Sequence, residues 1–456
     1  MRFWNTIALV SMTLLVARYA SAQDSLKITK LSQWKTGTQS VYNEVWGIAQ
    51  NGREYAVIGT WNGTYFIDVT DPSMPVMVDY VAGRDESCFC VHRDYHDYDG
   101  YLYMVTDEEP GSLQIVDLAD LPNSVSVVYD SDLLFTTSHN IFIDSSSALM
   151  YSCGGNPNSG ISVYSLASPT NPVLLKDFQT PGGYVHDVFV RNDTVYAHAG
   201  GNGMYVYDFS NVGAPQLIGS LEFYPHKGYN HAGWLNKAGD TYVFADETSN
   251  MDVKIADVTD LTDILIVDTV NTGGDTNSMA HNPIIKGALV YVSYYMDGLW
   301  IYDISDPGNT TVAGYYDLYV GAGDTISSGG AWGVYPFLPS GNILVSDMRS
   351  GLFVFDATEA ETNIEAIEKP KIGMSITPNP VVDRLNIRFD ERVDVRNIRI
   401  VDMAGKVVSY QGQKHSEQTI SYPISELRAG QYIVHVATGQ GSIVGTITKA
   451  ASNERR

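Results

Sequence analysis

The stretch "GGYVHDVFVRNDTVYAHAGGNGMYVYDFSNVGAPQLIG" (residues 182–219) contains short apolar segments with the character of β-strands, separated by turns rich in Gly, Asn and Asp. Similar stretches recur along the chain. One repeated strand, which usually ends in Asp, begins at Thr64, Leu113, Ile161, Met204, Val253, Leu299 and Leu352. These starting points lie 43 to 53 residues apart. A period in the forties with four short strands per unit is typical of a β-propeller blade.

The repeats predict an all-β fold, with a seven-bladed β-propeller over residues 23–356; a six- or eight-bladed ring is the alternative. An Asp ends the third strand of most units, before a turn. Its side chain can accept hydrogen bonds from backbone N–H groups that the turn leaves free. We therefore interpret these residues as structural: Asp68, Asp117, Asp208, Asp257, Asp303 and Asp356.

The last unit stops after its third strand, at Phe355-Asp356. A candidate for the missing strand lies at the other end of the chain, in "LKITKLSQW" (residues 26–34). Pairing this strand with the last blade would remove both open sheet edges. The sequence therefore predicts a ring closed by an N-terminal strand.

The ends of the chain differ from the repeats. Residues 1–22 combine Arg2, the apolar run "IALVSMTLLVA" and an "ASA" cleavage motif, which predicts a signal peptide and no transmembrane segment after cleavage. Residues 357–373 are polar and Glu-rich, as in a linker. Residues 374–456 alternate strands and turns, which predicts a small β-sandwich.

Charge and cysteine content narrow the function classes. Residues 23–372 carry a net charge of −29, and residues 373–456 carry +3. Such an acidic body would repel phosphate backbones, so no nucleic-acid partner is expected, whereas cations suit the field. Of the three cysteines, Cys88 and Cys90 are too close for an easy bridge, so Cys153 is expected to pair with one of them.

The C-terminal module resembles the type A (Por) sorting domain of the type IX secretion system of Bacteroidetes. The matching segments are "PNP" at 378–380, "IRIVDMAGKVV" at 398–408 and "ISELRAGQYIVHV" at 424–436. Their motif residues are Pro378, Asn379, Pro380, Gly405, Gly430 and Tyr432. The resemblance implies handling by the type IX secretion machinery, and a location outside the cell or at the outer-membrane surface after passage through the periplasm.

The propeller, over roughly residues 40–358, resembles the LVIVD-repeat, choice-of-anchor B proteins. The resemblance is carried by "IVDLAD" and "IYDISDP" repeats, by "SHNIFID", "VHDVFV", "NHAGW" and "AHNP", and by the segment at 330–355. It implies a propeller delivered to the cell surface, without an assigned reaction.

Histidines recur where the innermost strand of each blade should begin. The expected ligand-binding residues at this mouth of the central channel are Arg93, Asp94, His139, His186, Asp187, His231 and His281. The loops between second and third strands should bring carboxylates to the same mouth: Asp107, Glu108, Asp246, Glu247 and Asp347. Imidazoles suit Zn²⁺ and carboxylates suit Ca²⁺, so either ion is a candidate. The alternative is structural, with each ring N–H bonded to backbone or to an Asp of the neighbouring blade.

Two functions follow from this pattern. The first is a surface-attached binding module that docks a glycan, a peptide or a surface protein. The second is a metal-dependent hydrolase, of the lactonase or phosphatase kind, which uses the His/Asp cluster; this is an analogy of fold only. The sequence contains no nucleophile elbow, Walker loop or dinucleotide fingerprint, and it identifies no catalytic residue.

Overall fold

The computed structural model describes residues 25–37, 41–84, 90–108, 111–273, 279–319, 329–362, 373–402, 407–411, 414–438 and 441–450. The predicted signal peptide and the motif residue Gly405 lie outside this part of the chain. None of the described helices is long and apolar enough to cross a membrane.

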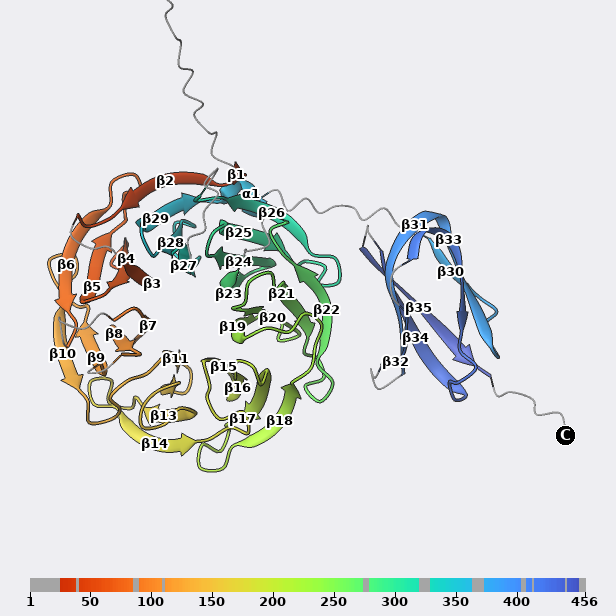
Figure 1. The fold of residues 1–456 in the computed structure, drawn as a ribbon, viewed down its shortest axis with the longest axis horizontal. Coiled ribbons are helices and arrows are strands. Elements are labelled where there is room, and N and C mark those ends of the chain that lie inside the picture. Colours follow the sequence, from red (N-terminus) through yellow and green to blue (C-terminus); the bar gives the residue numbers. More distant parts are fainter. Residues whose placement is uncertain are drawn as a thin grey trace, which may run out of the picture.

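Within the described part of residues 25–356, the strands form seven antiparallel sheets that are arranged around a central axis (Figure 1). The chain runs outward through each sheet. The innermost strands are β3 (Tyr42–Gln50), β7 (Arg93–Tyr98), β11 (Asn140–Asp144), β15 (Asp187–Arg191), β19 (Asn230–Leu235), β23 (Ala280–Lys286) and β27 (Ala331–Tyr335). Each innermost strand contacts the next, and β27 contacts β3, so the ring is continuous.

Three further strands complete each sheet. The second strands are β4 (Arg53–Thr60), β8 (Tyr101–Thr106), β12 (Leu149–Cys153), β16 (Thr194–His198), β20 (Thr241–Asp246), β24 (Leu289–Tyr294) and β28 (Ile343–Asp347). The third strands are β5 (Gly63–Asp68), β9 (Leu113–Asp117), β13 (Ile161–Ser165), β17 (Met204–Asp208), β21 (Val253–Asp257), β25 (Gly298–Asp303) and β29 (Gly351–Asp356). The outer strands are β6 (Val76–Ala82), β10 (Ser126–Ser131), β14 (Val173–Phe178), β18 (Gln216–Leu221), β22 (Leu265–Val270), β26 (Thr311–Tyr316) and β2 (Thr29–Trp34).

The N-terminal strand closes the ring, as the sequence predicts. β2 pairs with β29 and becomes the outer strand of the last sheet. In addition, β1 (Ser25–Leu26) pairs with β26 of the preceding sheet. Between the two strands, Ile28 is buried in a core formed by both sheets. The closure therefore joins two blades.

Side-chain hydrogen bonds confirm the structural interpretation of the repeated Asp residues. In each, one carboxylate oxygen accepts the backbone N–H of the residue two positions later, at 2.8–3.0 Å. The six pairs are Asp68–Thr70, Asp117–Ala119, Asp208–Ser210, Asp257–Thr259, Asp303–Ser305 and Asp356–Thr358. The repeat signature therefore stabilises the turn after the third strand, which leads to the outer strand in the first five cases and to a short helix after Asp356.

Two expectations about the chain are corrected. Cys153 does not pair with Cys88 or Cys90: it is a free, buried thiol in the core between the third and fourth sheets, and it donates to the His186 carbonyl (3.4 Å). Cys90 is disulfide-bonded, and Cys88 lies outside the described residues. The start of the expected linker is a short helix, α1 (Thr358–Thr362), whose Ala360 is buried in a propeller core.

The C-terminal domain is a single antiparallel sheet built around the long strand β31 (Arg384–Asp402). The other strands are β30 (Met374–Thr377), β32 (Val407–Gln411), β33 (Lys414–Pro423), β34 (Gly430–Thr438) and β35 (Gly441–Lys449). The first half of β31 pairs with β30 and β33, and the second half with β32 and β34. Both halves bury apolar residues in one core, and all described residues of this core belong to the C-terminal domain.

The sorting-motif residues have structural contacts. The Asn379 side chain donates to the Thr446 carbonyl and accepts the Thr448 N–H (2.8 Å), which holds the "PNP" segment against β35. The Tyr432 hydroxyl donates to the Arg428 carbonyl (2.9 Å). Gly430 begins β34.

Candidate functional site in the central channel

The inner strands line the channel with side chains of alternating chemistry. Alternate residues of a strand point to the same face, so residues two apart line the channel at successive depths. One cavity of about 80 Å³ is lined by such pairs from several inner strands, for example Glu44 and Trp46 on β3 and Asp187 and Phe189 on β15. This spacing gives a carboxyl and carboxamide layer and an aromatic layer. His139, His186 and His281 stand directly before Asn140, Asp187 and Asn282, and with His92 and His231 they add an imidazole layer at the start of the inner strands.

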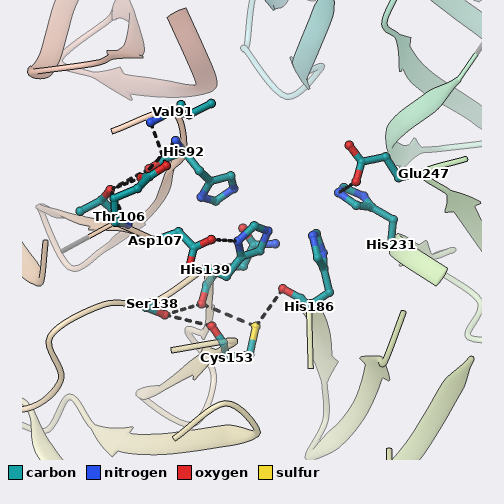
Figure 2. Close-up of polar contacts among 12 residues, drawn as sticks. Val91, His92, Thr106, Asp107, Ser138, His139, Cys153, His186, His231 and Glu247 are labelled. Carbon is teal, nitrogen blue, oxygen red and sulfur yellow. Dashed lines mark hydrogen bonds and ion pairs between the residues drawn. The ribbon is translucent and has the colours of Figure 1, made fainter. Parts of the chain in front are cut away.

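The imidazole layer is a closed ring of six side chains. Successive ring centroids are 4.0–4.5 Å apart from His92 through His139, His186, His231 and His281 to Trp332, and 5.9 Å separates Trp332 from His92. In Figure 2, the rings of His92, His139, His186 and His231 face a common space. The sequence predicts four of these histidines at this mouth and misses His92.

Hydrogen bonds fix the tautomer of two rings. His231 Nδ1 lies 3.1 Å from the His281 carbonyl, and His281 Nδ1 lies 2.7 Å from the Trp332 carbonyl. A carbonyl only accepts, so both Nδ1 atoms carry the proton and both Nε2 atoms present a lone pair. Each bond also ties one blade to the next, which is the structural contact expected for these residues.

Burial keeps the inner histidines neutral. It lowers the pKa of His92, His186 and His231 well below the ordinary 6.5, and neighbouring imidazoles lower each further. Burial also lowers the pKa of His281. Neutral imidazoles can ligate a metal, whereas imidazolium ions cannot.

Two of the five predicted carboxylates lie against an imidazole ring of the channel. Asp107 Oδ2 lies 2.8 Å from His139 Nδ1, and Glu247 Oε2 lies 3.6 Å from His231 Nε2 (Figure 2). Among the described residues, one group has donor atoms close enough to share a metal ion: His186, His231 and Glu247, all within 4.8 Å of one another.

The other three carboxylates have structural contacts instead. Asp246 forms a fully buried ion pair with Lys254 (2.7 Å) and accepts the Tyr224 hydroxyl. Glu108 accepts the backbone N–H of Val91 (2.9 Å), ahead of β7. Asp347 accepts the backbone N–H groups of the turn that follows it.

Arg93 does not line the channel. It is buried, and its guanidinium donates to the carbonyls of Thr60 and Trp61, on the preceding sheet. The preceding residue, His92, provides the ring that stacks on His139 (4.0 Å). The repeat alignment assumes that the channel-facing residue occupies the same position in every blade. Ahead of β7 this position is shifted by one residue, from 93 to 92, and the alignment cannot detect such a shift.

The carboxyl layer lies between the imidazole layer and the aromatic layer. Burial, followed by the charge of Asp94, raises the pKa of Glu44 to about 8 and that of Asp187 to about 8. Burial raises the pKa of Asp94 to about 7. The Asn282 side chain donates to Glu44 (2.9 Å). These groups hold protons near neutral pH until a cation or base removes them.

The aromatic layer is a second closed ring, at the opposite mouth. Trp46, His96, Phe142, Phe189, Trp234, Phe337 and Tyr335 follow one another with centroids 4.8–5.8 Å apart, and Tyr335 returns to Trp46 (5.1 Å). These seven residues line a cavity of about 410 Å³, with Asp144, Ser145, Ser146 and Asn192 at its rim. We call this cavity the aromatic cup.

The sequence predictions above do not include Glu44 or the residues of the aromatic cup, although the inner strands carry a repeated pattern that indicates them. The inner strands repeat a polar residue, any residue and an aromatic ring: Glu44-Val45-Trp46, Asp94-Tyr95-His96, Asn140-Ile141-Phe142 and Asp187-Val188-Phe189. Because side chains two positions apart on a strand point to the same face, the polar residue and the aromatic residue of each pattern both face the channel.

Family models match two parts of the chain. The LVIVD repeat model matches residues 45–82, 182–222 and 274–318, which correspond to three of the sheets. The model of the secretion system C-terminal sorting domain matches residues 375–450. No curated protein matches the chain. The sorting domain indicates export by the type IX secretion system to the cell surface or the extracellular space. The chain thus contains LVIVD repeats in its β-propeller and a type IX secretion sorting domain after it.

Proposed function

We propose that this exported propeller is a binding module for basic peptide segments, and that the aromatic cup receives one lysine side chain. The observation that carries the proposal is the closed ring of seven aromatic residues that opens inward onto buried carboxyl groups. An aliphatic stem can pack against the rings, while its ammonium group approaches the carboxyl layer.

Two further features favour a cation, in addition to the attraction of aromatic faces for positive charge. Asp144 Oδ2 is buried at the cup and has no hydrogen-bond partner among the described residues. The net charge of −29 over residues 23–372 would attract a basic peptide over longer distances.

The carboxyl layer gives this binding a proton signature. Glu44 and Asp187 hold protons near pH 7 because they are buried without a counter-charge. An ammonium group nearby favours their ionised forms, so binding should release protons.

Calorimetric titration with a short lysine peptide tests the proposal, with its isosteric norleucine peptide as the ligand control. The lysine peptide should bind and release protons, and the norleucine peptide should bind at least about tenfold more weakly. Trp234→Ala and Asp144→Asn should each weaken binding severalfold. Phe223→Ala removes a 90% exposed aromatic outside the cup and should change nothing.

Equal binding of both peptides, or binding of neither, would overturn the proposal. Binding of a neutral oligosaccharide that Trp234→Ala abolishes would assign the cup to a glycan instead. The matching family models name no reaction, so the hydrolase alternative is not favoured.

A further inference from the structure

Two hydrogen-bond acceptors face each other at the histidine-lined mouth. His231 Nδ1 donates to the His281 carbonyl, so His231 Nε2 carries a lone pair. That atom lies 3.6 Å from Glu247 Oε2, in a site where the His231 side chain is 3% exposed. Lone pairs this close repel one another unless a cation lies between them.

His186 supplies a third donor atom. It is 5% exposed and lies next to His231, with ring centroids 4.2 Å apart. Its Nδ1 makes no hydrogen bond to the described residues. In Figure 2, the rings of His186 and His231 and the carboxylate of Glu247 converge from neighbouring blades.

Neighbouring groups already orient the donors. The Tyr295 hydroxyl donates to Glu247 Oε1 (2.5 Å), which leaves Oε2 for another partner. The Glu247 backbone N–H bonds to the Tyr229 carbonyl (2.8 Å). Metal-binding imidazoles and carboxylates in proteins usually have such hydrogen-bond partners on the side away from the metal, which fix their orientation.

We propose that His186, His231 and Glu247 bind a divalent transition-metal ion of the zinc class, at the mouth opposite the aromatic cup. Two imidazole nitrogens and one carboxylate oxygen suit zinc, whereas calcium takes six to eight oxygen ligands. Ligands about 2.0–2.2 Å from a tetrahedral zinc lie about 3.3–3.6 Å apart. The His231–Glu247 separation of 3.6 Å matches this spacing. The largest separation in the group, 4.8 Å at most, requires a shift of about an ångström.

The experiment uses the purified protein, stripped with a chelator and titrated with Zn²⁺, and with Co²⁺ as a spectroscopic probe. One equivalent of metal should bind, and Co²⁺ should give the visible absorption of a site with nitrogen and oxygen ligands. His231→Ala and Glu247→Gln should weaken binding at least about tenfold. Tyr295→Phe, which removes only the bond that orients Glu247, should weaken it about tenfold.

His226→Ala is the matched control, because His226 is exposed and lies outside the donor group. It should leave the stoichiometry and affinity unchanged. Should His231→Ala fail to fold, Glu247→Gln decides, since it preserves shape. Absence of a stoichiometric site, or unchanged affinity in Glu247→Gln, overturns the proposal. Lysine-peptide binding does not involve these residues, so the two proposals fail separately.

Discussion

Glu44 lies in the wall of the channel, where the fold favours its protonated form. Its side chain is buried, the Val45 N–H donates to Oε1, and Asn282 donates to Oε2. Its pKa rises from 4.5 to about 8, first through burial and then through Asp94. The folded state therefore binds more protons than the unfolded state between these values, and stability falls as pH rises through this window.

The buried histidines have the opposite effect on stability, at acidic pH. Their pKa values are lowered, that of His198 to about 4 by burial. The folded state therefore binds fewer protons than the unfolded state below about pH 6.5, and stability also falls on acidification. The two effects predict maximal stability near pH 6.5.

Glu44→Gln tests the carboxyl contribution, because glutamine resembles the protonated acid. In the wild-type protein, raising the pH from 6.5 to 8 should cost up to about 2 kcal/mol through this one group. The variant should lose that part of the slope in denaturant unfolding across the same pH range. Glu222→Gln, at an exposed carboxyl group, is the control. An unchanged slope in Glu44→Gln would contradict the prediction.

For single residues, the sequence predicts which residues share a repeat position better than it predicts their hydrogen-bond and ion-pair partners. It places His139, His186, His231 and His281 together because they share a repeat position. Asp246 and Asp347 share a loop position with Asp107 and Glu247, but they bond to Lys254 and to the following turn. Such partners depend on side-chain direction and on strand bulges, such as that between Asn230 and Ala232, which a repeat alignment does not contain.

Among the elements, the entry to β27 depends on Gly330. Its φ is +129°, and a Cβ there would lie 1.8 Å from the Tyr295 carbonyl oxygen. That oxygen accepts the Ala331 N–H (2.9 Å), which holds β27 against the end of β24. Strand pairing and the position of Tyr295 therefore both require glycine at this point.

Gly330→Ala should destabilise the propeller by about 2–4 kcal/mol, through positive φ and overpacking together. Gly341→Ala is the matched control, because Gly341 also has positive φ but has nothing within 4 Å of the added Cβ. It should cost only about 1–2 kcal/mol. Denaturant unfolding measures the free energy of unfolding of both variants. Equal losses of stability in the two variants would contradict the prediction, because they would show that the Cβ clash at position 330 is relieved without strain.

The element order was largely predictable, because turn chemistry and strand alternation are local signals. The predicted third-strand starts lie within one residue of those of β5, β9, β13, β17, β21, β25 and β29. The pairing of β2 with β29 was predictable from an incomplete last unit. β1 was not, because two residues carry no periodicity, and its pairing depends on burial of Ile28 between two sheets.

In the whole molecule, the channel and the sorting domain belong to separate cores. Among the described residues, the C-terminal core is formed between Met374 and Ile447, and the channel layers lie within the propeller. The repeats form the wall of the channel from equivalent strands. The titratable groups that distinguish one part of the wall from another, such as Glu44 and the Glu247–His231 contact, each occur in one blade and not in all of them. The acidic propeller and the sorting domain can therefore be altered one at a time.

This separation predicts the effect of removing the sorting domain. A chain that ends before Met374 should fold its propeller but remain in the periplasm, because the domain that indicates type IX export is absent. Cell fractionation and protease treatment of intact cells measure the location, and thermal unfolding of the retained protein measures the fold. The full-length Phe223→Ala variant is the control, since Phe223 is 90% exposed on the propeller, and it should reach the surface like the wild-type protein. Surface display of the truncated chain would show that export does not require this domain. An unfolded periplasmic product would instead show that the propeller depends on it, contrary to the separate cores seen in the structure.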